Sequence, residues 1–488
     1  MTPTPTTRLA PSRRPASWST RSNATRRCAR ASCISPCCTT RAICGSCRSR
    51  STRHLSPRSR NTWMATPFSL LVDLGATYVK VAVLRPDEGV VAERRYPFPP
   101  FTSLDGPYRT VDPAEVLAAV EAAIASGLPP AATPQRILLS GQMHGWTLTD
   151  EHNVPHLPLI TWQDNRALRV HNGIAQLDRL RQSFAPDVWH AVGNELRSGL
   201  PVAGIFATDL SAFDGRVRVH SLLSWVAAAL TKKPDFVAHV TDAAASGMFD
   251  LTTGSWSERL TTSVGGSRML LPRVSSSLAA VGVHERSGAT VYTPVGDQQA
   301  AFLGAGLRAG VTACNIATGG QVARLACAHA GDRCQTRPYF DGMLLHTRTH
   351  LPAGRALTHG IALLSRGRAD DEAWRWAANA AAAPARTELP RAHPSFHTVA
   401  GGGWSGITDA TSPEDLVRAL VAAVASPYVE GAVDVGFQPT DELLFCGGVA
   451  QRFAPLRAAI QMSLQLPARV APEGDMALRG LAVLAGRI

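Results

Sequence analysis

The sequence predicts an α/β protein built from two similar lobes. Strand–turn–strand patterns over residues 69–84 and 312–326 support this fold class. Short, almost continuous apolar runs at 136–140 and 442–445 are typical of strands in sheets covered on both faces. Because the hairpin pattern occurs twice, we expect a duplicated domain.

Each hairpin has a glycine-containing turn, Gly75-Ala76-Thr77 in the first and Thr318-Gly319-Gly320 in the second. Glycine has no side chain to keep a ligand away from the backbone, and threonine adds a hydroxyl donor. We therefore expect Gly75, Thr77, Thr318, Gly319 and Gly320 to be able to approach phosphate oxygens.

Two helices are predicted by their start signals. Asp112-Pro113 precedes one apolar face that ends at Gly127, and Ser412-Pro413 precedes another. Each helix is expected to pack its apolar face on a sheet. We place the boundary between the lobes near residue 300, giving lobes at 64–300 and 301–488.

The positive charge of the 488-residue chain is concentrated at one end. Of 49 Lys and Arg residues, 13 fall in residues 1–63, where no acidic residue occurs, and the remainder nearly balance the 37 acidic residues. Nucleic acid is therefore not an expected partner of the folded part.

Residues 1–63, a basic segment rich in Arg, Ser and Cys, admit three interpretations. They could be a mis-annotated start, a transit peptide or a real basic arm for polyanions. Only three lysines occur among the 49 basic residues, which suggests GC-rich coding DNA and favours a mis-annotated start. A chain that began at Met64 would lead directly into the first predicted strand. The segment is expected to be disordered if it is translated.

The composition points to a cytoplasmic protein that does not enter a membrane. Four scattered cysteines beyond residue 63 resemble reduced thiols, and we expect no stretch near the ~18 apolar residues that span a bilayer. A homodimer is one assembly that such a protein could form.

Two familiar phosphate-binding signatures do not apply. None of the three lysines follows a glycine, as a Walker loop requires. The string Gly401-x-Gly403-x-x-Gly406 is not followed by a helical pattern, so it is expected to be a loop.

Five motifs occur in order along the chain: Asp73-Leu-Gly75-Ala-Thr77-Tyr-Val-Lys80, Ser140-Gly-Gln142-Met143-His144-Gly145, Thr161-Trp162-Gln163-Asp164, Gly296-Asp297-Gln298-Gln299, and Gly447-Gly448-Val-Ala450. Together they resemble the FGGY carbohydrate kinases from about residue 69 to the end. The resemblance implies two actin-like (ribonuclease-H-like) ATPase lobes with an active-site cleft between them.

By this resemblance Asp297 is the general base and also contacts substrate and metal. On physical grounds alone an aspartate before Gln298 is equally well explained as a helix N-cap, and the two roles are compatible. We expect its carboxylate to stay ionised at neutral pH and to accept a sugar hydroxyl's proton.

The resemblance also implies that Asp73 orients Mg²⁺ on ATP, although a turn aspartate explains it as well. Lys80 is either a nucleotide contact or a solvated strand residue. The remaining nucleotide contacts are expected at the two hairpin turns and at Gly447, Gly448 and Ala450, where a plain glycine turn is the alternative.

Sugar contacts are implied for Gln142, Met143, His144, Trp162 and Asp164. His144 could instead be an ordinary hydrogen-bonded loop residue, and Asp164 could form a surface ion pair with Arg166 beside the buried ring of Trp162. The implied function is an ATP- and Mg²⁺-dependent ketose kinase acting on a terminal hydroxyl.

Thr161-Trp162-Gln163-Asp164 and Pro338-Tyr339-Phe340 are most similar to sedoheptulokinases, whereas Gln142-Met143-His144-Gly145 is equally similar to xylulokinases. Sedoheptulose is therefore the favoured acceptor, with xylulose or another pentulose as the alternative. A non-catalytic sugar or nucleotide sensor on the same fold, and a polyanion-binding protein, are the hypotheses from other classes.

Overall fold

The structure is a computed structural model that describes residues 67–103, 106–128, 133–232, 234–384, 388–396 and 401–488. The interpretations of residues 1–63 lie outside these described residues. The order of helices and strands confirms the α/β class.

The first lobe contains a large mixed sheet. Its strand order is β11-β17-β18-β5-β1-β2-β3, with β19 also paired to β5. β1 and β2 form the predicted antiparallel hairpin, and β5 runs parallel to β1. The bounds are β1 (Ser69–Leu74), β2 (Tyr78–Arg85), β3 (Gly89–Pro97), β5 (Arg136–Gly141), β11 (Thr231–Lys232), β17 (Ala280–His284), β18 (Thr290–Tyr292) and β19 (Val295–Gly296).

The second lobe repeats this plan. Its sheet has the order β22-β23-β21-β20-β26-β27; β20 and β21 form an antiparallel hairpin, and β26 runs parallel to β20. The bounds are β20 (Val311–Ile316), β21 (Gly320–Ala326), β22 (Gln335–Pro338), β23 (Leu344–Leu351), β26 (Glu442–Cys446) and β27 (Ala468–Val470). The shared plan confirms the duplication expected from the two hairpins and agrees with the actin-like fold that the resemblance implies.

The first lobe also carries a smaller sheet with the order β15-β10-β6-β7-β4. An apolar cluster that includes Trp146, Leu148 and Val219 joins this sheet to short helices. The bounds are β4 (Thr110–Val111), β6 (Trp146–Thr149), β7 (Leu159–Ile160), β10 (Val217–Ser221), β15 (Met269–Leu270), α3 (Gln176–Gln182), α4 (Pro186–Ala191), α5 (Pro201–Phe206), α6 (Leu222–Leu230), α7 (Val240–Ala244) and α8 (Glu258–Val264).

Both helices predicted from their start signals are confirmed. In α2 (Pro113–Gly127) the Asp112 side chain accepts from the N–H of Ala114, and α12 (Pro413–Asp434) begins with a capping box between Ser412 and Asp415. α12 packs in the second lobe against α10 (Gly354–Leu364), α11 (Asp370–Ala382) and α14 (Ala454–Leu464).

The expectation that no stretch is long and apolar enough to span a bilayer is wrong for α12. By length and composition alone, α12 could cross a membrane, and half of its most apolar 18-residue window is buried inside the protein. Its buried residues, among them Val417, Leu420 and Val424, belong to the core of the second lobe. A core helix of a folded protein passes the same test, so the finding carries little weight.

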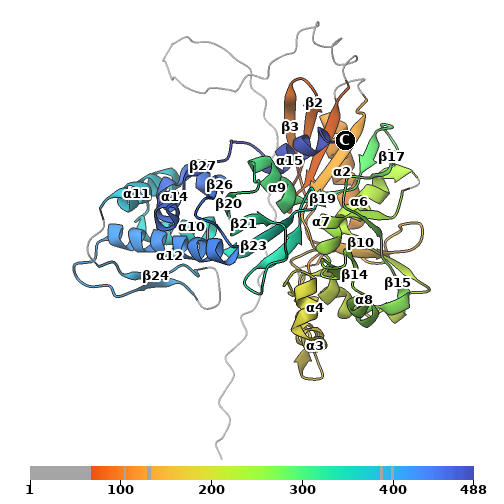
Figure 1. Ribbon diagram of the computed structural model, residues 1–488, viewed down its shortest axis with the longest axis horizontal. Helices are drawn as coiled ribbons and strands as arrows, with labels where there is room; N and C mark the ends of the chain where they lie inside the picture. The colour runs from red at the N-terminus through yellow and green to blue at the C-terminus, as the bar shows by residue number, and fades with distance from the viewer. Residues whose placement is uncertain (1–66, 104–105, 129–132, 233, 385–387, 397–400) are drawn as a thin grey trace, which may run out of the picture. The chain divides into compact units, whose positions relative to one another are not determined.

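α9 (Asp297–Ala305) and α15 (Met476–Ala485) lie side by side between the two large sheets (Figure 1). They approach so closely that a Cβ on Gly480 would lie 1.9 Å from the carbonyl oxygen of Ala300. One apolar cluster joins them to both sheets through Leu71 and Leu444. The boundary near residue 300 stays a prediction, and α9 occupies that position.

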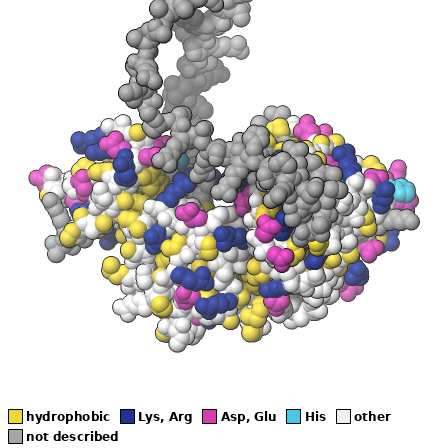
Figure 2. All heavy atoms as spheres, turned by 90° about the horizontal axis from the view of Figure 1, so that it is seen from above, with side chains coloured by type: hydrophobic (Ala, Val, Ile, Leu, Met, Phe, Trp, Pro, Cys, Tyr) yellow, Lys and Arg dark blue, Asp and Glu magenta, His cyan; other side chains and the backbone are white. Residues whose placement is uncertain are grey.

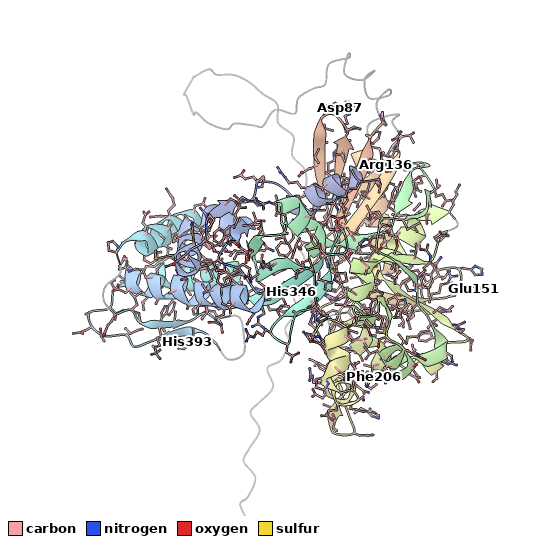
Figure 3. All side chains as sticks on the ribbon, in the orientation of Figure 1. Asp87, Arg136, Glu151, Phe206, His346 and His393 are labelled. Carbon is pink, nitrogen blue, oxygen red and sulfur yellow. The ribbon has the colours of Figure 1, made fainter. Side chains whose placement is uncertain are left out.

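The last helix is also bonded to the first lobe. Arg136, which lies at the start of β5 and is labelled in Figure 3, donates hydrogen bonds to the backbone oxygens of Ala485 and Ile488 at 3.0 and 2.7 Å. The end of the chain thus completes the lobe in which the described fold begins.

The string from Gly401 to Gly406 is not entirely a loop. β25 (Gly403–Ser405) pairs with β24 (Arg391–His393), so the loop prediction needs this correction. Ala392 and Trp404 oppose each other in this pair. The aromatic packing of Trp404 on Phe396 explains why the glycine-rich string adopts a strand there.

Candidate active site

Three pockets meet at the carboxyl ends of the central strands. The arginine pocket, of about 400 Å³, contains Arg197 and Arg337; the lysine pocket, of about 320 Å³, contains Lys80; the tryptophan pocket, of about 990 Å³, contains Trp374. The first two share Asp297, Gln298, Asn315 and Gln321, while the first and third share Ala317 and Thr318. The pockets are therefore neighbours, and Asp297 lies at the junction of two of them.

Most of the predicted site residues line these pockets. The arginine pocket includes Gln142, Met143, His144, Trp162, Asp297, Thr318, Gly319 and Gly320. The lysine pocket includes Asp73, Gly75, Lys80, Asp297 and Gly447, and the tryptophan pocket includes Thr318 and Gly448. Thr77, Asp164 and Ala450 line none of the three.

Asp297 is the first residue of α9, and Gly296 holds the N-cap position. The prediction of an Asp297 N-cap therefore needs correction, although its Oδ1 does accept from the N–H of Gln298 at 2.7 Å. Burial, then the neighbouring Asp73, raise the pKa of Asp297 to about 7. The expectation of full ionisation at neutral pH therefore needs correction, because a carboxyl with a pKa of about 7 is only partly ionised there.

Asp73 sits at the centre of a three-strand polar group. In the sheet register it lies opposite Lys80 on β2 and Ser140 on β5. Its two oxygens accept from Lys80 Nζ at 2.8 Å and from Ser140 Oγ at 2.9 Å. Lys80 also pairs with Asp475 at 2.8 Å. Burial lowers the pKa of Lys80, but Asp73 and Asp475 together raise it above its ordinary value.

The second lobe carries an uncharged counterpart of this group. Asn315 on β20 lies opposite Gln321 on β21 and Cys446 on β26, as Asp73 lies opposite Lys80 and Ser140. Gln321 is tied to α9, since Gln298 Nε2 donates to its Oε1 at 2.6 Å. The duplicated fold thus presents carboxylates from one lobe and amides from the other to the same lysine pocket.

The hydrogen bonding of His144 defines which of its ring nitrogens carries the proton. Its backbone has a φ of 68°, and Nδ1 lies 2.7 Å from the carbonyl oxygen of Ala245. Since a carbonyl can only accept, Nδ1 carries the proton and Nε2 is left as an acceptor. Burial, and after it the charge of Arg197, lower the pKa of His144 to about 3, so the ring is neutral.

The neighbouring Gln142 and Met143 line the arginine pocket together with His144. Gln142 is buried, and its Nε2 donor has no hydrogen-bond partner among the described residues. Met143 packs against Gly296, where a Cβ would lie 2.6 Å from the methionine sulfur. An unpartnered donor beside a pocket is what a site for a hydroxylated ligand presents.

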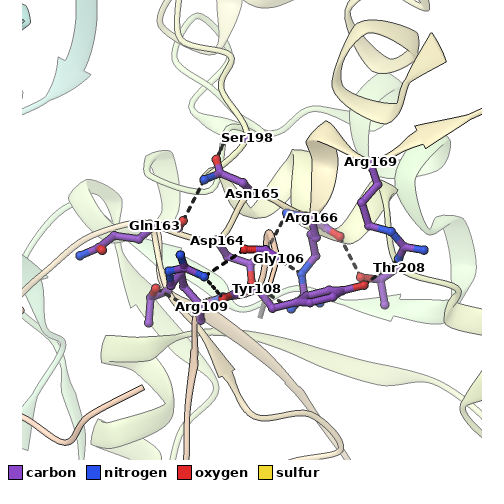
Figure 4. A network of polar contacts seen from close by, with 12 residues as sticks. Gly106, Tyr108, Arg109, Gln163, Asp164, Asn165, Arg166, Arg169, Ser198 and Thr208 are labelled. Carbon is purple, nitrogen blue, oxygen red and sulfur yellow. Dashed lines mark hydrogen bonds and ion pairs between the residues drawn. The ribbon is translucent and has the colours of Figure 1, made fainter. Parts of the chain in front are cut away.

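Asp164 is turned into the protein rather than toward a pocket (Figure 4). Its carboxylate accepts from the N–H of Arg109 at 2.8 Å and from the N–H and Nε of Arg166, both at 2.9 Å. The ion pair with Arg166 is present, but it is buried rather than on the surface, and the ring beside it is that of Trp146 rather than Trp162. The structure does not bring Asp164 together with the other predicted sugar contacts.

The glycines of the second lobe make close approaches that a side chain would block. A Cβ on Gly320 would lie 1.9 Å from the Tyr428 hydroxyl, and one on Gly447, whose φ is 95°, would lie 2.5 Å from the carbonyl oxygen of Ile316. Gly319 and Gly448 face open space. The two turns therefore expose backbone to the pockets, as a phosphate cradle requires.

Several pocket residues have no counterpart in the sequence prediction. They are Arg197, Arg337, His350, Trp374 and Asp475, and Glu195, which pairs with both arginines, was not predicted either. Asp475 precedes an apolar run and caps α15 through the N–H groups of Ala477 and Leu478, so the N-cap signal could have revealed it. Arg337 directly precedes the Pro338-Tyr339-Phe340 string, but neither its pairing with Glu195 nor the position of Arg197 has a sequence signal.

The residues also fit a magnesium–nucleotide complex. Among the described residues no group of three or more His, Cys, Asp or Glu side chains could hold a metal ion alone. Mg²⁺ needs no such cage, because one or two carboxylates plus phosphate oxygens and water suffice. Asp73 and Asp297 line the same pocket as Gly75 and Gly447, so carboxylates and exposed backbone are together.

Comparisons with known proteins agree with this fold. Residues 68–304 match the model of the FGGY family of carbohydrate kinases, N-terminal domain. A curated relative, glycerol kinase 2 of Streptomyces coelicolor, is 29% identical over 171 residues, which are 30% of this chain and 33% of that protein. The chain thus aligns with about a third of the length of this relative.

Two solved structures share the fold over most of the chain. The ligand-bound xylulose kinase of Lactobacillus acidophilus superposes with a TM-score of 0.76 at 15% identity, covering 86% of this chain and 89% of that one. The Plasmodium falciparum glycerol kinase with ADP has a TM-score of 0.74 at 17% identity, with the same coverages. The first lobe therefore matches the FGGY family of carbohydrate kinases by sequence, and most of the chain shares the fold of these two kinases.

Proposed function

We propose that the protein transfers the γ-phosphoryl group of ATP to a terminal hydroxyl of a small polyhydroxylated acceptor. The observation that carries this proposal is the position of Asp297, which lines both the arginine pocket and the lysine pocket. A base at such a junction can reach an acceptor on one side and a phosphate on the other.

The nucleotide belongs in the lysine and tryptophan pockets. Gly447 lines the first and Gly448 the second, so the turn after β26 connects the phosphate region to the larger cavity. In that cavity Trp374 is packed edge-on against Phe453, with ring centroids 5.3 Å apart, and offers an aromatic surface for a base. The ADP named in the Plasmodium falciparum structure supports a nucleotide as the donor.

Asp73 and Asp297 would hold Mg²⁺, whose chemistry is to neutralise charge on the phosphates being separated. Lys80 supplies a fixed positive charge in the same pocket and orients Asp73 through their 2.8 Å ion pair. The backbone at Gly319 and Gly447 supplies N–H groups to phosphate oxygens, whereas the N–H of Gly75 is already bonded to the carbonyl oxygen of Tyr78.

Asp297 accepts the proton of the attacking hydroxyl. A carboxyl with a pKa of about 7 is a stronger base than an ordinary aspartate, which speeds proton removal as the bond to phosphorus forms. His144 Nε2 and the amide of Gln142 offer an acceptor and a donor to other hydroxyls of the acceptor. Trp162 lines the same pocket, where its ring restricts the space open to the acceptor.

The identity of the acceptor is the finer part of this proposal. The ketose prediction, sedoheptulose before xylulose, rests on motif resemblance, while the proteins compared above are named xylulose and glycerol kinases. Asp164 and Ala450 stay predictions whose positions outside the pockets argue against direct contact. The expected homodimer and cytoplasmic location also stay predictions.

The test is ADP release by the full chain with sedoheptulose, xylulose, ribulose, fructose and glycerol as acceptors. We expect ADP release that depends on an acceptor, and a loss of at least ~10²-fold in kcat for Asp297→Asn, the lower range expected for a general base. ATP or acceptor binding without any acceptor-dependent ADP would favour the sensor alternative. Equal turnover by the Asn variant would remove Asp297 from the mechanism.

A further inference from the structure

Two arginines stand at the end of the arginine pocket beside His144. Arg197 lies on the segment between α4 and α5, and Arg337 lies on β22 of the second lobe. Both line the pocket together with Gln142 and His350. A pocket for a neutral acceptor needs hydroxyl partners, but it does not need two guanidinium groups.

The positive charge at this end is only partly neutralised. Glu195 accepts from Arg337 Nη2 at 2.5 Å and from Arg197 Nε at 2.9 Å. Among the described residues it is the one carboxylate paired with either arginine. Burial works to raise the pKa of Glu195, but Arg337 and other positive neighbours hold it near 2, so it carries one full negative charge. Two cations thus share one anion.

The other titratable groups of the pocket do not neutralise the excess positive charge of Arg197 and Arg337. His144 and His350 have pKa values lowered by burial first and by Arg197 next, so both rings are neutral. Asp297 lies at the junction with the lysine pocket, where burial and then Asp73 raise its pKa to about 7, while Lys80 and Arg337 act in the opposite direction. An incompletely paired buried charge is unfavourable unless a ligand completes it.

The arginines are fixed in place before any ligand arrives. Asn194 Nδ2 donates to the carbonyl oxygens of Gly331 and Cys334 at 3.0 and 3.1 Å, which ties the segment carrying Arg197 to the second lobe. The chain next passes so close to Trp162 that a Cβ on Gly199 would lie 1.9 Å from the tryptophan carbonyl oxygen. Arg337 is nine-tenths buried, and its Nε has no partner among the described residues.

We propose that the acceptor is a sugar acid whose carboxylate is bound by Arg197 and Arg337 while its terminal hydroxyl faces Asp297. Guanidinium groups bind carboxylates through paired, charge-assisted hydrogen bonds, which suits a planar anion at this end. The inference rests on the proposed phosphoryl transfer and narrows its acceptor class from neutral sugars to polyhydroxy acids.

The first experiment compares acids with their neutral counterparts of equal length. The full chain is assayed for ADP release with glycerate, erythronate, xylonate and gluconate against glycerol, erythritol, xylitol and glucitol, with xylulose, sedoheptulose and glucose 6-phosphate as further arms. We expect kcat/KM for the best acid to exceed that of its alditol and of every ketose by roughly 10- to 100-fold, the range of one charged hydrogen-bonded pair. A preferred ketose, alditol or phosphate ester overturns the inference and leaves the kinase proposal standing.

The second experiment removes the guanidinium. Arg197→Met should raise KM for the preferred acid by roughly 10- to 100-fold while kcat/KM for the matching alditol changes less than about threefold. Arg197→Lys keeps the positive charge but loses the paired N–H donors of the guanidinium group, so an intermediate KM is expected. Arg259→Met is the matched control, because Arg259 forms an exposed ion pair with Asp187. An equal fall in kcat for all acceptors would place the arginine on the transferred phosphate and contradict the proposal.

A direct binding measurement separates the two proposals. Calorimetric titration with gluconate and glucitol, without ATP, should show gluconate binding that Arg197→Met abolishes and Arg259→Met retains. Gluconate binding without ADP release from any acceptor would retain this inference and refute the proposed kinase activity. Equal affinity for gluconate and glucitol, or gluconate binding unchanged by Arg197→Met, would overturn the inference.

Discussion

Lys80 Nζ lies 2.8 Å from a carboxylate oxygen of Asp475, an ion pair that joins the second strand of the first sheet to the first turn of the last helix. Lys80 makes an equal contact with Asp73, so one ammonium group serves two largely buried carboxylates. The pair links the fold's closing helix to the pocket where Asp297 faces Asp73.

Lys80→Met should therefore destabilise the protein strongly. Removing one partner of a buried ion pair costs about 3–5 kcal/mol, and here two carboxylates lose their cation. Lys232→Met is the control, because Lys232 and Glu285 are exposed and 3.9 Å apart, and such pairs contribute about 1 kcal/mol or less. Denaturant unfolding of both variants measures the difference, and equal free energies of unfolding would contradict the structural role of Lys80.

The pH dependence of the rate should report Asp297. Because the base acts when deprotonated, kcat/KM should rise with pH and level off above about 7, following the raised pKa. Asp297→Asn should be at least ~10²-fold slower and lack this rise. A wild-type profile that is flat from pH 5 to 8 would show that another group limits the rate.

The same carboxyl should make the protein less stable at high pH. Its pKa rises from an ordinary 3.8 in the unfolded chain to about 7 in the folded protein, so ionisation opposes folding. This contribution is absent below about pH 4 and grows as the pH rises through about 7. Asp297→Asn should lose less stability than wild type between pH 5 and 8 in parallel denaturant titrations, and identical slopes would speak against the raised pKa.

Asp164→Asn should affect stability rather than acceptor binding. The carboxylate is buried and accepts from Arg166 and the backbone of Arg109, so the variant leaves the Arg166 guanidinium poorly paired. We expect a loss of about 3 kcal/mol in unfolding free energy and less than a threefold change in KM for the acceptor. A large rise in KM at unchanged stability would restore the predicted sugar contact.

Trp374→Ala should weaken nucleotide binding and leave the acceptor unaffected. Trp374 lines the tryptophan pocket, whereas Trp376, on the same helix, donates its indole N–H to Glu414 and lines none of the three pockets. Loss of an aromatic surface worth about 1 kcal/mol should raise KM for ATP roughly fivefold, with Trp376→Ala near wild type. Equal ATP affinity in both variants would place the base elsewhere.

Gly480→Ala should break the contact between α9 and α15. A methyl group there would lie 1.9 Å from the carbonyl oxygen of Ala300, so the helices must separate, at a cost of about 1–3 kcal/mol. At Gly486 the nearest atom to such a methyl lies at 3.5 Å, an ordinary contact, so Gly486→Ala should change stability by less than about 0.5 kcal/mol. Thermal unfolding of the two alanine variants provides the comparison.

Local signals predicted much of the fold. The turns at Gly75 and Gly319 set two hairpins, and the caps at Asp112 and Ser412 set two helices, because each depends on a few adjacent residues. Asp297 was placed at its helix from the same kind of signal, one position from the cap it was assigned.

The groups that long-range packing brings together had no such signal. The raised pKa of Asp297 depends on Asp73, more than two hundred residues earlier, and the Glu195–Arg337 pair joins residues 142 positions apart. At Asp164 a motif match favours a ligand contact, whereas nearby arginine and backbone donors already occupy the carboxylate. Motif order cannot reveal which direction a side chain takes.

The bonds from Arg136 to the carbonyl oxygens of Ala485 and Ile488 span 349 and 352 residues of chain. During synthesis, Leu71 and Leu138 emerge long before the helix that covers them, since both pack in the cluster containing Leu481 and Leu484. A nascent first lobe therefore exposes apolar sheet surface until α15 has been synthesised. Folding of the lobe that holds Asp73 must wait for a helix that lies about four hundred residues further along the chain.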